Sequence, residues 1–175
     1  MPSLKPRALS PGDLIGIAAP AGPVDEKRLA RGVRELEALG FSVRVAPGVL
    51  ERERFTAGTV EVRREQLEGL LADPEVAAIM CARGGAGAGR LLSKLDTSLL
   101  RTYLKPVVGY SDITWLHLAM GRLGLVSVHG PMVARELADG EGAYERASLL
   151  HALTGRGEPF ASRPGDAHPL RRGEG

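Results

Sequence analysis

Short apolar runs rich in β-branched residues alternate with longer amphipathic runs along most of this chain, and this alternation limits the possible folds more than any other feature. The short runs are predicted strands at residues 14–18, 42–46, 76–81, 106–109 and 126–129. Strands that alternate with helical segments are typical of βαβ units, in which the strands run parallel. The pattern predicts an α/β fold with a mainly parallel sheet flanked by helices, of the Rossmann or flavodoxin kind.

The longer runs place apolar residues at helical spacing. Residues 24–39 carry leucine or valine at positions 29, 33, 36 and 39, and Gly40 follows as a stop signal. The same pattern predicts helices over 60–71, 111–123 and 142–153. Helices between consecutive strands complete the expected βαβ order.

The composition changes after Thr154. Residues 155–175 contain five Gly, three Pro and four Arg, with almost no apolar periodicity, which is typical of a linker. We expect residues 1–154 to form one domain, and residues 155–175 to lead toward a C-terminal domain that is absent from this sequence.

Charge and cysteine content exclude several classes of protein. The 23 basic and 21 acidic residues give a formal net charge of +2, so nothing indicates a nucleic acid or an anionic membrane as a partner. No apolar run approaches the roughly 20 residues of a membrane-spanning helix. The single cysteine, Cys81, excludes an internal disulfide, and the N-terminus lacks the pattern of a signal peptide. We therefore expect a cytoplasmic protein.

The strongest local motif is KPVVGYSDITWLHLA at residues 105–119, where an apolar strand runs through a short turn into a helix. Ser111 in that turn would lie at the carboxyl edge of the sheet and at a helix N-terminus, where backbone N–H groups favour a developing negative charge. Both features suit a nucleophile, although Ile113 replaces the second glycine of a G-x-S-x-G elbow. The alternative is that Ser111 or Asp112 only caps the following helix.

A glycine-rich turn follows the predicted strand at 76–81. Glycines at positions 84, 85, 87 and 89 would let the backbone approach a ligand and present N–H groups as an anion site or oxyanion hole. The spacing does not fit a dinucleotide fingerprint, and Lys105 stands about 20 residues on, where that fingerprint needs an acidic residue. The alternative is a tight strand-to-helix turn without a ligand.

Together with their surroundings, these motifs resemble the LD-carboxypeptidase family of serine peptidases, which includes the microcin C7 self-immunity peptidases. The resemblance covers roughly residues 8–155 and is most specific in the combination of ARGG, GYSDIT and HGPM. The matching segments are PGDLIGIAAPAG at 11–22, RFTAGT at 54–59, ARGGAGAGRLLSKLD at 82–96, KPVVGYSDITWLHLA at 105–119 and GLVSVHGPM at 124–132.

The resemblance implies a role for each matching residue. Ser111 would be the nucleophile, and the backbone N–H groups of Asp112 and Gly85 would form the oxyanion hole. Apart from the resemblance, we expect Arg83 and Gly84 to contact the substrate. Arg83 and Arg90 could pair with its terminal carboxylate, although Arg90 is as easily a solvated helix residue. No metal or organic cofactor is implied. The family's general base, a His paired with a Glu, lies in the C-terminal domain, so we expect this chain alone to be nearly inactive.

The histidines and the cysteine of this chain do not supply that base. His117 lies two helical turns beyond the nucleophile, where a packed or surface role is expected. His129 belongs to the HGPM turn and is interpreted as structural support, while His151 and His168 have no partner suggested by the sequence. Cys81 is predicted to be a small core residue. Ala86 stands where the family often has an aromatic residue, which affects the substrate contacts expected there.

The implied substrate is the tetrapeptide of peptidoglycan, cut to release its terminal D-alanine during cell-wall recycling. Two other functions stay open. A non-catalytic module could bind a small anion or a peptide carboxylate with the same turn, and a Rossmann-like domain could bind a nucleotide. A surface that faces the absent domain would be apolar and prone to association, so a homodimer also stays open.

Overall fold

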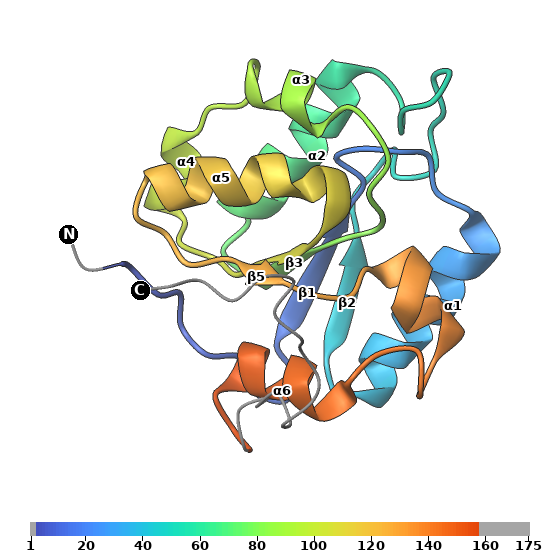
Figure 1. The fold of residues 1–175 in the computed structure, drawn as a ribbon, viewed down its shortest axis with the longest axis vertical. Coiled ribbons are helices and arrows are strands. Elements are labelled where there is room, and N and C mark those ends of the chain that lie inside the picture. The colour runs from blue at the N-terminus through green and yellow to red at the C-terminus, as the bar shows by residue number, and fades with distance from the viewer. Residues whose placement is uncertain (1–2, 158–175) are drawn as a thin grey trace, which may run out of the picture.

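The computed structural model describes residues 3–157 and confirms the predicted α/β fold. In this part of the chain, five parallel strands form one sheet in the order β2-β1-β3-β4-β5 (Figure 1). The strands are β1 (Leu14–Ala18), β2 (Ser42–Val45), β3 (Val76–Cys81), β4 (Val107–Gly109) and β5 (Val128–His129). All five were predicted; three of them end or begin one or two residues inside the predicted limits.

Strand β3 forms the middle of the sheet because every one of its six residues is buried. It pairs with β1 on one side, where Ile17 lies opposite Met80, and with β4 on the other, where Val108 lies opposite Met80. A strand covered on both faces needs a continuous apolar run, and VAAIMC supplies one. The order of the strands reverses between β1 and β3, and such a switch point is where open α/β sheets bind their ligands.

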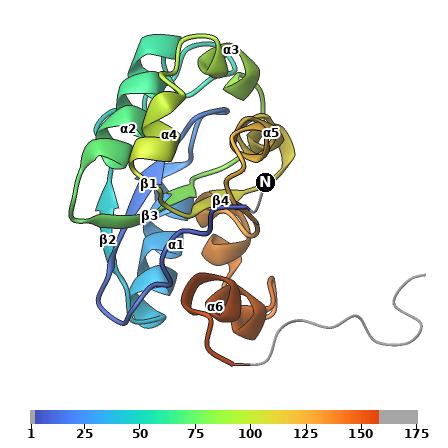
Figure 2. The same cartoon turned by 90° about the vertical axis from the view of Figure 1, so that its left-hand side faces the viewer.

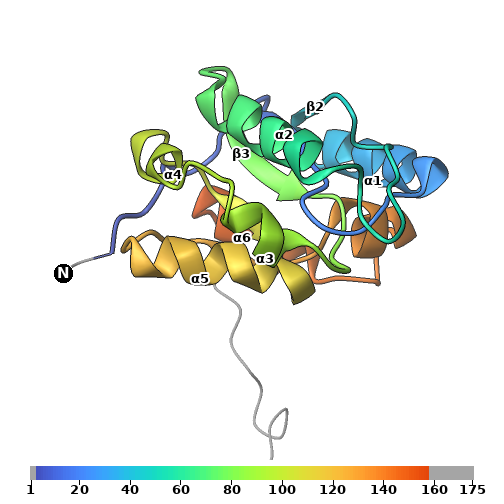
Figure 3. The same ribbon diagram turned by 90° about the horizontal axis from the view of Figure 1, so that it is seen from above.

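The helices divide between the two faces of the sheet (Figure 2). The long helices are α1 (Glu26–Ala38) and α2 (Val60–Ala72), which Asp25 and Thr59 cap by accepting hydrogen bonds from the backbone N–H groups of Arg28 and Val62. The others are α3 (Ala88–Leu92), α4 (Ser98–Thr102), α5 (Thr114–Arg122) and α6 (Arg146–Thr154). Helices α2, α3, α4 and α5 cover one face, and α1 and α6 cover the other (Figure 3).

Two connections differ from the sequence-based expectation. The predicted helix over 111–123 begins with a separate 3₁₀ turn, η1 (Ser111–Ile113), before α5 starts. A wide helical turn that was not predicted, η2 (Val133–Leu137), contains non-helical backbone at Ala134 and Arg135 and packs against α1. Both departures lie beside the carboxyl edge of the sheet.

The predicted division into a domain at 1–154 and a linker at 155–175 stays a prediction, because residues 158–175 lie outside the described residues. Within the described part, α6 does belong to the folded body. Its Leu149 and Leu153 are buried in the core, and Leu9 N–H donates a hydrogen bond to the Leu153 carbonyl.

Candidate functional site

Three loops meet at the carboxyl edge of the sheet, and the ends of β1, β3 and β4 set their positions. The Ala82 N–H donates to the Ala18 carbonyl at 2.7 Å, which aligns the ends of β1 and β3. Slightly further out, the Gly22 N–H donates to the Gly84 carbonyl at 3.0 Å. The glycine-rich turn is therefore attached to the loop after β1.

Ser111 stands at the tip of the turn after β4 in an unusual backbone conformation. Its φ of +62° lies in the left-handed region, which few residues with a side chain adopt, and the preceding residue Tyr110 is fully extended. Such a turn is the geometry of a nucleophile elbow. Ser111 is exposed, and neither its side chain nor that of Asp112 caps η1 or α5.

The glycine-rich turn lies directly against Ser111. A methyl group placed on Gly84 would come within 2.9 Å of the Ser111 Cβ and 3.1 Å of its Oγ, so only glycine fits beside the hydroxyl. Gly85 and Gly87 have φ values of +126° and +120°, which a residue with a side chain would adopt only under strain. Among the turn and cap hydrogen bonds of residues 3–157, none uses the backbone N–H of Gly85 or of Asp112.

The Asp112 carboxylate connects the elbow to the glycine-rich turn. Its Oδ2 accepts a hydrogen bond of 2.8 Å from the Ala88 N–H, at the start of α3. The sequence suggested only a capping role for this side chain within its own helix. The structure instead directs it across to the neighbouring loop, so the side chain of Asp112 fixes the turn while its backbone N–H remains beside Ser111.

Arg83 and Arg90 occupy different surroundings. The Arg83 side chain donates to the Gly84 carbonyl at 3.3 Å and to the Pro23 carbonyl at 3.2 Å, so the loop itself uses part of its guanidinium. Arg90 is exposed on α3, and its side chain lines an open cleft of about 840 Å³ beside the turn.

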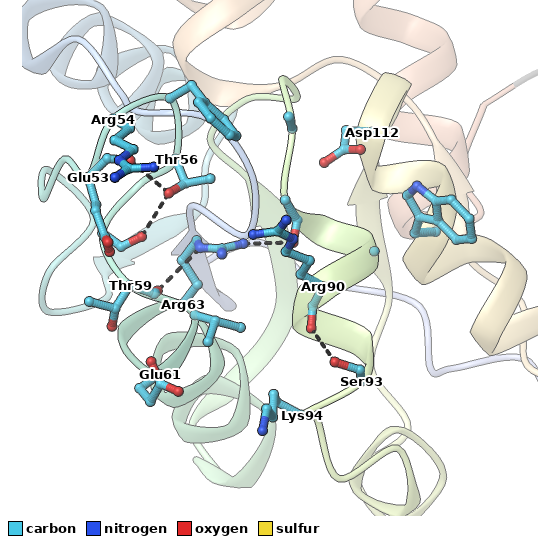
Figure 4. A pocket seen from close by; sticks show the side chains of 17 residues that line it. Glu53, Arg54, Thr56, Thr59, Glu61, Arg63, Arg90, Ser93, Lys94 and Asp112 are labelled. Carbon is cyan, nitrogen blue, oxygen red and sulfur yellow. Dashed lines mark hydrogen bonds between the residues drawn. The ribbon is translucent and has the colours of Figure 1, made fainter.

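That cleft lies between α2, α3 and the loop at 53–59 (Figure 4). Arg63 of α2 is buried in the wall of this cleft and extends toward α3, and Arg90 lines the cleft from α3. Asp112 belongs to the elbow and also lines the cleft, whereas Ser111 is not part of the lining. The cleft therefore adjoins the serine and does not enclose it.

Tyr110, immediately before the serine, makes a contact that the sequence did not indicate. Its hydroxyl donates to Glu136 Oε1 at 2.7 Å, and the other carboxylate oxygen accepts from the Met132 N–H at 3.2 Å. This hydrogen bond to Glu136, together with burial, raises the pKa of the Tyr110 phenol. The turn η2 thus anchors the residue that precedes the elbow, and no local motif marks Glu136 for this role.

His117 has the packed position expected for it. Its Nε2 lies 2.8 Å from the Gly109 carbonyl and its Nδ1 lies 2.9 Å from Ser127 Oγ. Because a carbonyl only accepts, Nε2 carries the proton and Nδ1 accepts from the serine hydroxyl. Burial lowers the pKa of His117, so the ring is neutral near pH 7. Both ring nitrogens are occupied, and His117 links the end of β4 to the segment before β5.

Of the remaining candidates, none in the described residues forms a hydrogen bond with Ser111. His129 is exposed and packs its ring 5.7 Å from that of Tyr110. His151 contacts the Gly157 carbonyl on the opposite side of the fold, and His168 lies outside the described residues. Cys81 is buried in β3, as predicted, and burial raises the pKa of its thiol to about 12.

Two kinds of feature are absent from residues 3–157. In that part of the chain, no three His, Cys, Asp or Glu side chains gather as a metal site would require. No helix within it has the length and apolarity needed to cross a membrane.

Comparison with known proteins identifies relatives for most of the described chain. The family of the LD-carboxypeptidase N-terminal domain matches residues 15–130. A Bacillus subtilis protein named "Probable murein peptide carboxypeptidase" is 41% identical over 134 residues, which are 76% of this chain and 42% of that protein. The murein tetrapeptide carboxypeptidase of Pseudomonas aeruginosa is 38% identical over 119 residues, 67% of this chain and 39% of that protein.

The fold has relatives among solved structures as well. An MccF-like protein from Bacillus anthracis superposes with a TM-score of 0.80 at 31% identity, over 87% of this chain and 47% of its own. This chain spans less than half the length of each of these three relatives. Because the family match covers more than half of this chain and includes both the glycine-rich turn and the serine elbow, the chain belongs to the LD-carboxypeptidase family.

Proposed function

We propose that this chain carries the nucleophile of a serine-type LD-carboxypeptidase that releases the terminal D-alanine from the tetrapeptide of peptidoglycan. Membership in the family and the names of its relatives, which include a murein tetrapeptide carboxypeptidase, support a carboxypeptidase function. The assignment of the nucleophile, the bond and the substrate is our proposal.

One observation carries this proposal: an exposed serine with a φ of +62° packs against a glycine that has no room for a side chain. Backbone strain of this kind costs on the order of 1–3 kcal/mol and persists where function requires it. If Ser111 served only as a helix cap, it would need neither the left-handed conformation nor the contact with Gly84. A nucleophile that must project from a sharp turn needs both.

In the proposed reaction, Ser111 Oγ attacks the carbonyl carbon of the bond before the terminal D-alanine. The carbonyl oxygen becomes an oxyanion, which the backbone N–H groups of Gly85 and Asp112 would bind. The C–N bond then breaks, D-alanine leaves with a proton on its amine, and water hydrolyses the resulting ester to restore the serine. The free N–H groups of the turn are consistent with this role.

The general base is the part of the mechanism that residues 3–157 do not provide. Ser111 Oγ forms no side-chain hydrogen bond within them, and His117 is committed to Gly109 and Ser127. We propose that the base comes from the C-terminal His and Glu expected from the family, and that this chain alone turns over slowly. Loss of triad members from a serine hydrolase costs about 10⁴ to 10⁶ in kcat.

The substrate would extend from Ser111 across the glycine-rich turn. We propose that Gly84 allows its backbone to approach the serine and that Arg83 attracts its terminal carboxylate with the donors that the loop leaves free. Arg90 would bind a second carboxylate of the peptide from the adjoining cleft. We further propose that the enzyme acts in the cytoplasm on recycled wall peptides, and that a homodimer is one form it can adopt.

A non-catalytic binding module is the second candidate, and the open cleft favours it. Arg54, Arg90 and Lys94 line the cleft, and no ion pair within residues 3–157 includes them, so they could attract a small anion or a peptide carboxylate. In that case the serine would be dispensable for binding and no product would form.

One experiment separates the two candidates. It measures the release of D-alanine from the tetrapeptide by the protein that the longest open reading frame containing this chain encodes. We expect release that Ser111→Ala abolishes, and we expect no release from an otherwise identical peptide that ends in L-alanine. If the wild type and Ser111→Ala bind the peptide with equal affinity and neither releases D-alanine, the protein is a binding module and not this enzyme.

A further inference from the structure

Arg63 is a charged side chain buried in the wall between α2 and the glycine-rich turn. It is only 3% exposed, and burial lowers the pKa of its guanidinium. A buried charge is costly unless it is well hydrogen-bonded. Within residues 3–157 no carboxylate forms a salt bridge with it, so backbone carbonyls supply its partners.

These carbonyls belong to three separate segments around the candidate site. Arg63 Nη1 donates to the Pro20 carbonyl at 2.9 Å, in the loop after β1, and to the Gly87 carbonyl at 2.8 Å, in the glycine-rich turn. Its Nε donates to the Thr59 carbonyl at 3.3 Å, at the start of α2 (Figure 4). The guanidinium therefore ties the turn to the helix and to the end of β1.

The peptide unit between Gly87 and Ala88 is held at both of its polar ends. Its carbonyl accepts from Arg63, and its N–H donates to the carboxylate of Asp112 at 2.8 Å. A methyl group on Gly87 would lie 2.7 Å from Arg63 Nη1, so the contact is close. Asp112 follows Ser111 directly, which connects Arg63 to the elbow through a single peptide unit.

We infer that Arg63 and Asp112 form a clamp on the Gly87–Ala88 peptide that positions the glycine-rich turn against Ser111. This inference rests on the proposed function, because the clamp would place the Gly85 N–H where the oxyanion develops. Arg63 is then a positioning residue and touches no reacting atom. An arginine is suited to this task because its fork reaches several acceptors at once, which a lysine ammonium does not match.

The fold contains a matched control for this role. Lys105 is also a buried cation, 9% exposed, and its Nζ donates to the carbonyls of Leu70 and Asp73 at the other end of α2. It lies just before β4, at the amino edge of the sheet and away from Ser111. Loss of Lys105 should lower stability, as loss of Arg63 does, without moving the turn.

The first test uses the protein encoded by the longest open reading frame that contains this chain. It compares the variants Arg63→Met, Arg63→Lys and Lys105→Met with the wild type. We expect Arg63→Met to lower kcat for D-alanine release about tenfold or more with little change in KM, because small displacements of catalytic groups have effects of this size. Arg63→Lys should retain more of the activity, and Lys105→Met should keep kcat while it lowers the urea midpoint. An unchanged kcat in folded Arg63→Met would overturn the inference.

The second test asks whether the two residues act on the same peptide. Asp112→Ala should also lower kcat, Asp112→Asn should restore part of it because an amide oxygen still accepts, and the double variant Arg63→Met with Asp112→Ala should lose less than the product of the single losses. Multiplicative losses in the double variant would overturn the clamp.

The third readout does not need activity. Hydrogen exchange of the Ala88 amide should accelerate in Arg63→Met and in Asp112→Ala but not in Lys105→Met, compared at equal global stability. If the wild-type protein releases no D-alanine, the proposed function is wrong. Hydrogen exchange of the Ala88 amide still tests whether Arg63 and Asp112 hold the Gly87–Ala88 peptide. Ala88 exchange that is equal in all variants would overturn it.

Discussion

Ser111 combines an unfavourable backbone conformation with a close contact to a neighbouring loop. Its backbone is in the left-handed region, and its side chain fills the space that a Cβ at Gly84 would need. The sequence predicted both residues as part of the site, because the GYSDIT and ARGG motifs contain them. It could not identify Arg63, which reads as an ordinary polar position in the helix VEVRREQLEGLLA. Only the folded turn brings the Pro20 and Gly87 carbonyls to it.

The strain at Ser111 predicts a difference in stability between two substitutions of this residue. Ser111→Gly removes the Cβ that makes φ = +62° unfavourable, whereas Ser111→Ala keeps it. After the entropy of glycine in the unfolded chain is subtracted, Ser111→Gly should be roughly 0.5–1 kcal/mol more stable than Ser111→Ala. Urea unfolding of both variants measures this difference. If Ser111→Gly is instead less stable than Ser111→Ala by about 0.5–1 kcal/mol, which is the full entropy of glycine in the unfolded chain, the elbow carries no strain.

Gly84 predicts a loss of activity without a loss of fold. In Gly84→Ala the new methyl group would push on the Ser111 Cβ and Oγ, and the expected cost is roughly 10- to 100-fold in kcat. Gly121→Ala, on α5 with no atom within 4 Å of the new methyl group, should leave kcat unchanged. Full activity in Gly84→Ala would show that the serine and the turn are not in contact.

Among the helices and strands, the number of residues in an element decided whether the sequence predicted it. The strands and the helices α1, α2, α5 and α6 were foreseen because their apolar periodicity extends over enough residues. Helices α3 and α4 have five residues each, which is too short for a periodic pattern, and η2 has a non-helical backbone at Arg135. The link from Tyr110 to Glu136 spans 26 positions, and no local rule predicts it.

The packing of η2 on α1 gives a prediction at this scale. A methyl group on Gly32 of α1 would lie 1.9 Å from the Val133 carbonyl oxygen, so Gly32→Ala must separate the two elements. We expect a loss of about 2 kcal/mol in the free energy of unfolding. Gly69→Ala on α2, which meets nothing within 4 Å, should instead gain about 0.5–1 kcal/mol. Chemical denaturation measures the free energy of unfolding of both variants. An unchanged free energy of unfolding in Gly32→Ala would contradict the tight packing of η2 on α1.

For the whole molecule, the central strand provides a natural reporter. Cys81 is the single cysteine, is fully buried at the end of β3, and has a thiol whose pKa burial raises to about 12. At pH 8 it should therefore react with a thiol reagent only when the fold opens, about a thousandfold or more slowly than in urea. Comparable rates in both conditions would show that the core is not closed.

The proposed activity of the whole molecule requires Ser111 to be the nucleophile, and covalent labelling can detect a nucleophilic serine without a substrate. The protein encoded by the longest open reading frame that contains this chain is treated with a fluorophosphonate, and mass spectrometry locates the adduct. We predict one adduct, on the Ser111 hydroxyl, which is absent from Ser111→Ala and forms more slowly in Gly84→Ala. An adduct on another residue, or labelling that persists in Ser111→Ala, would show that Ser111 is not the nucleophile.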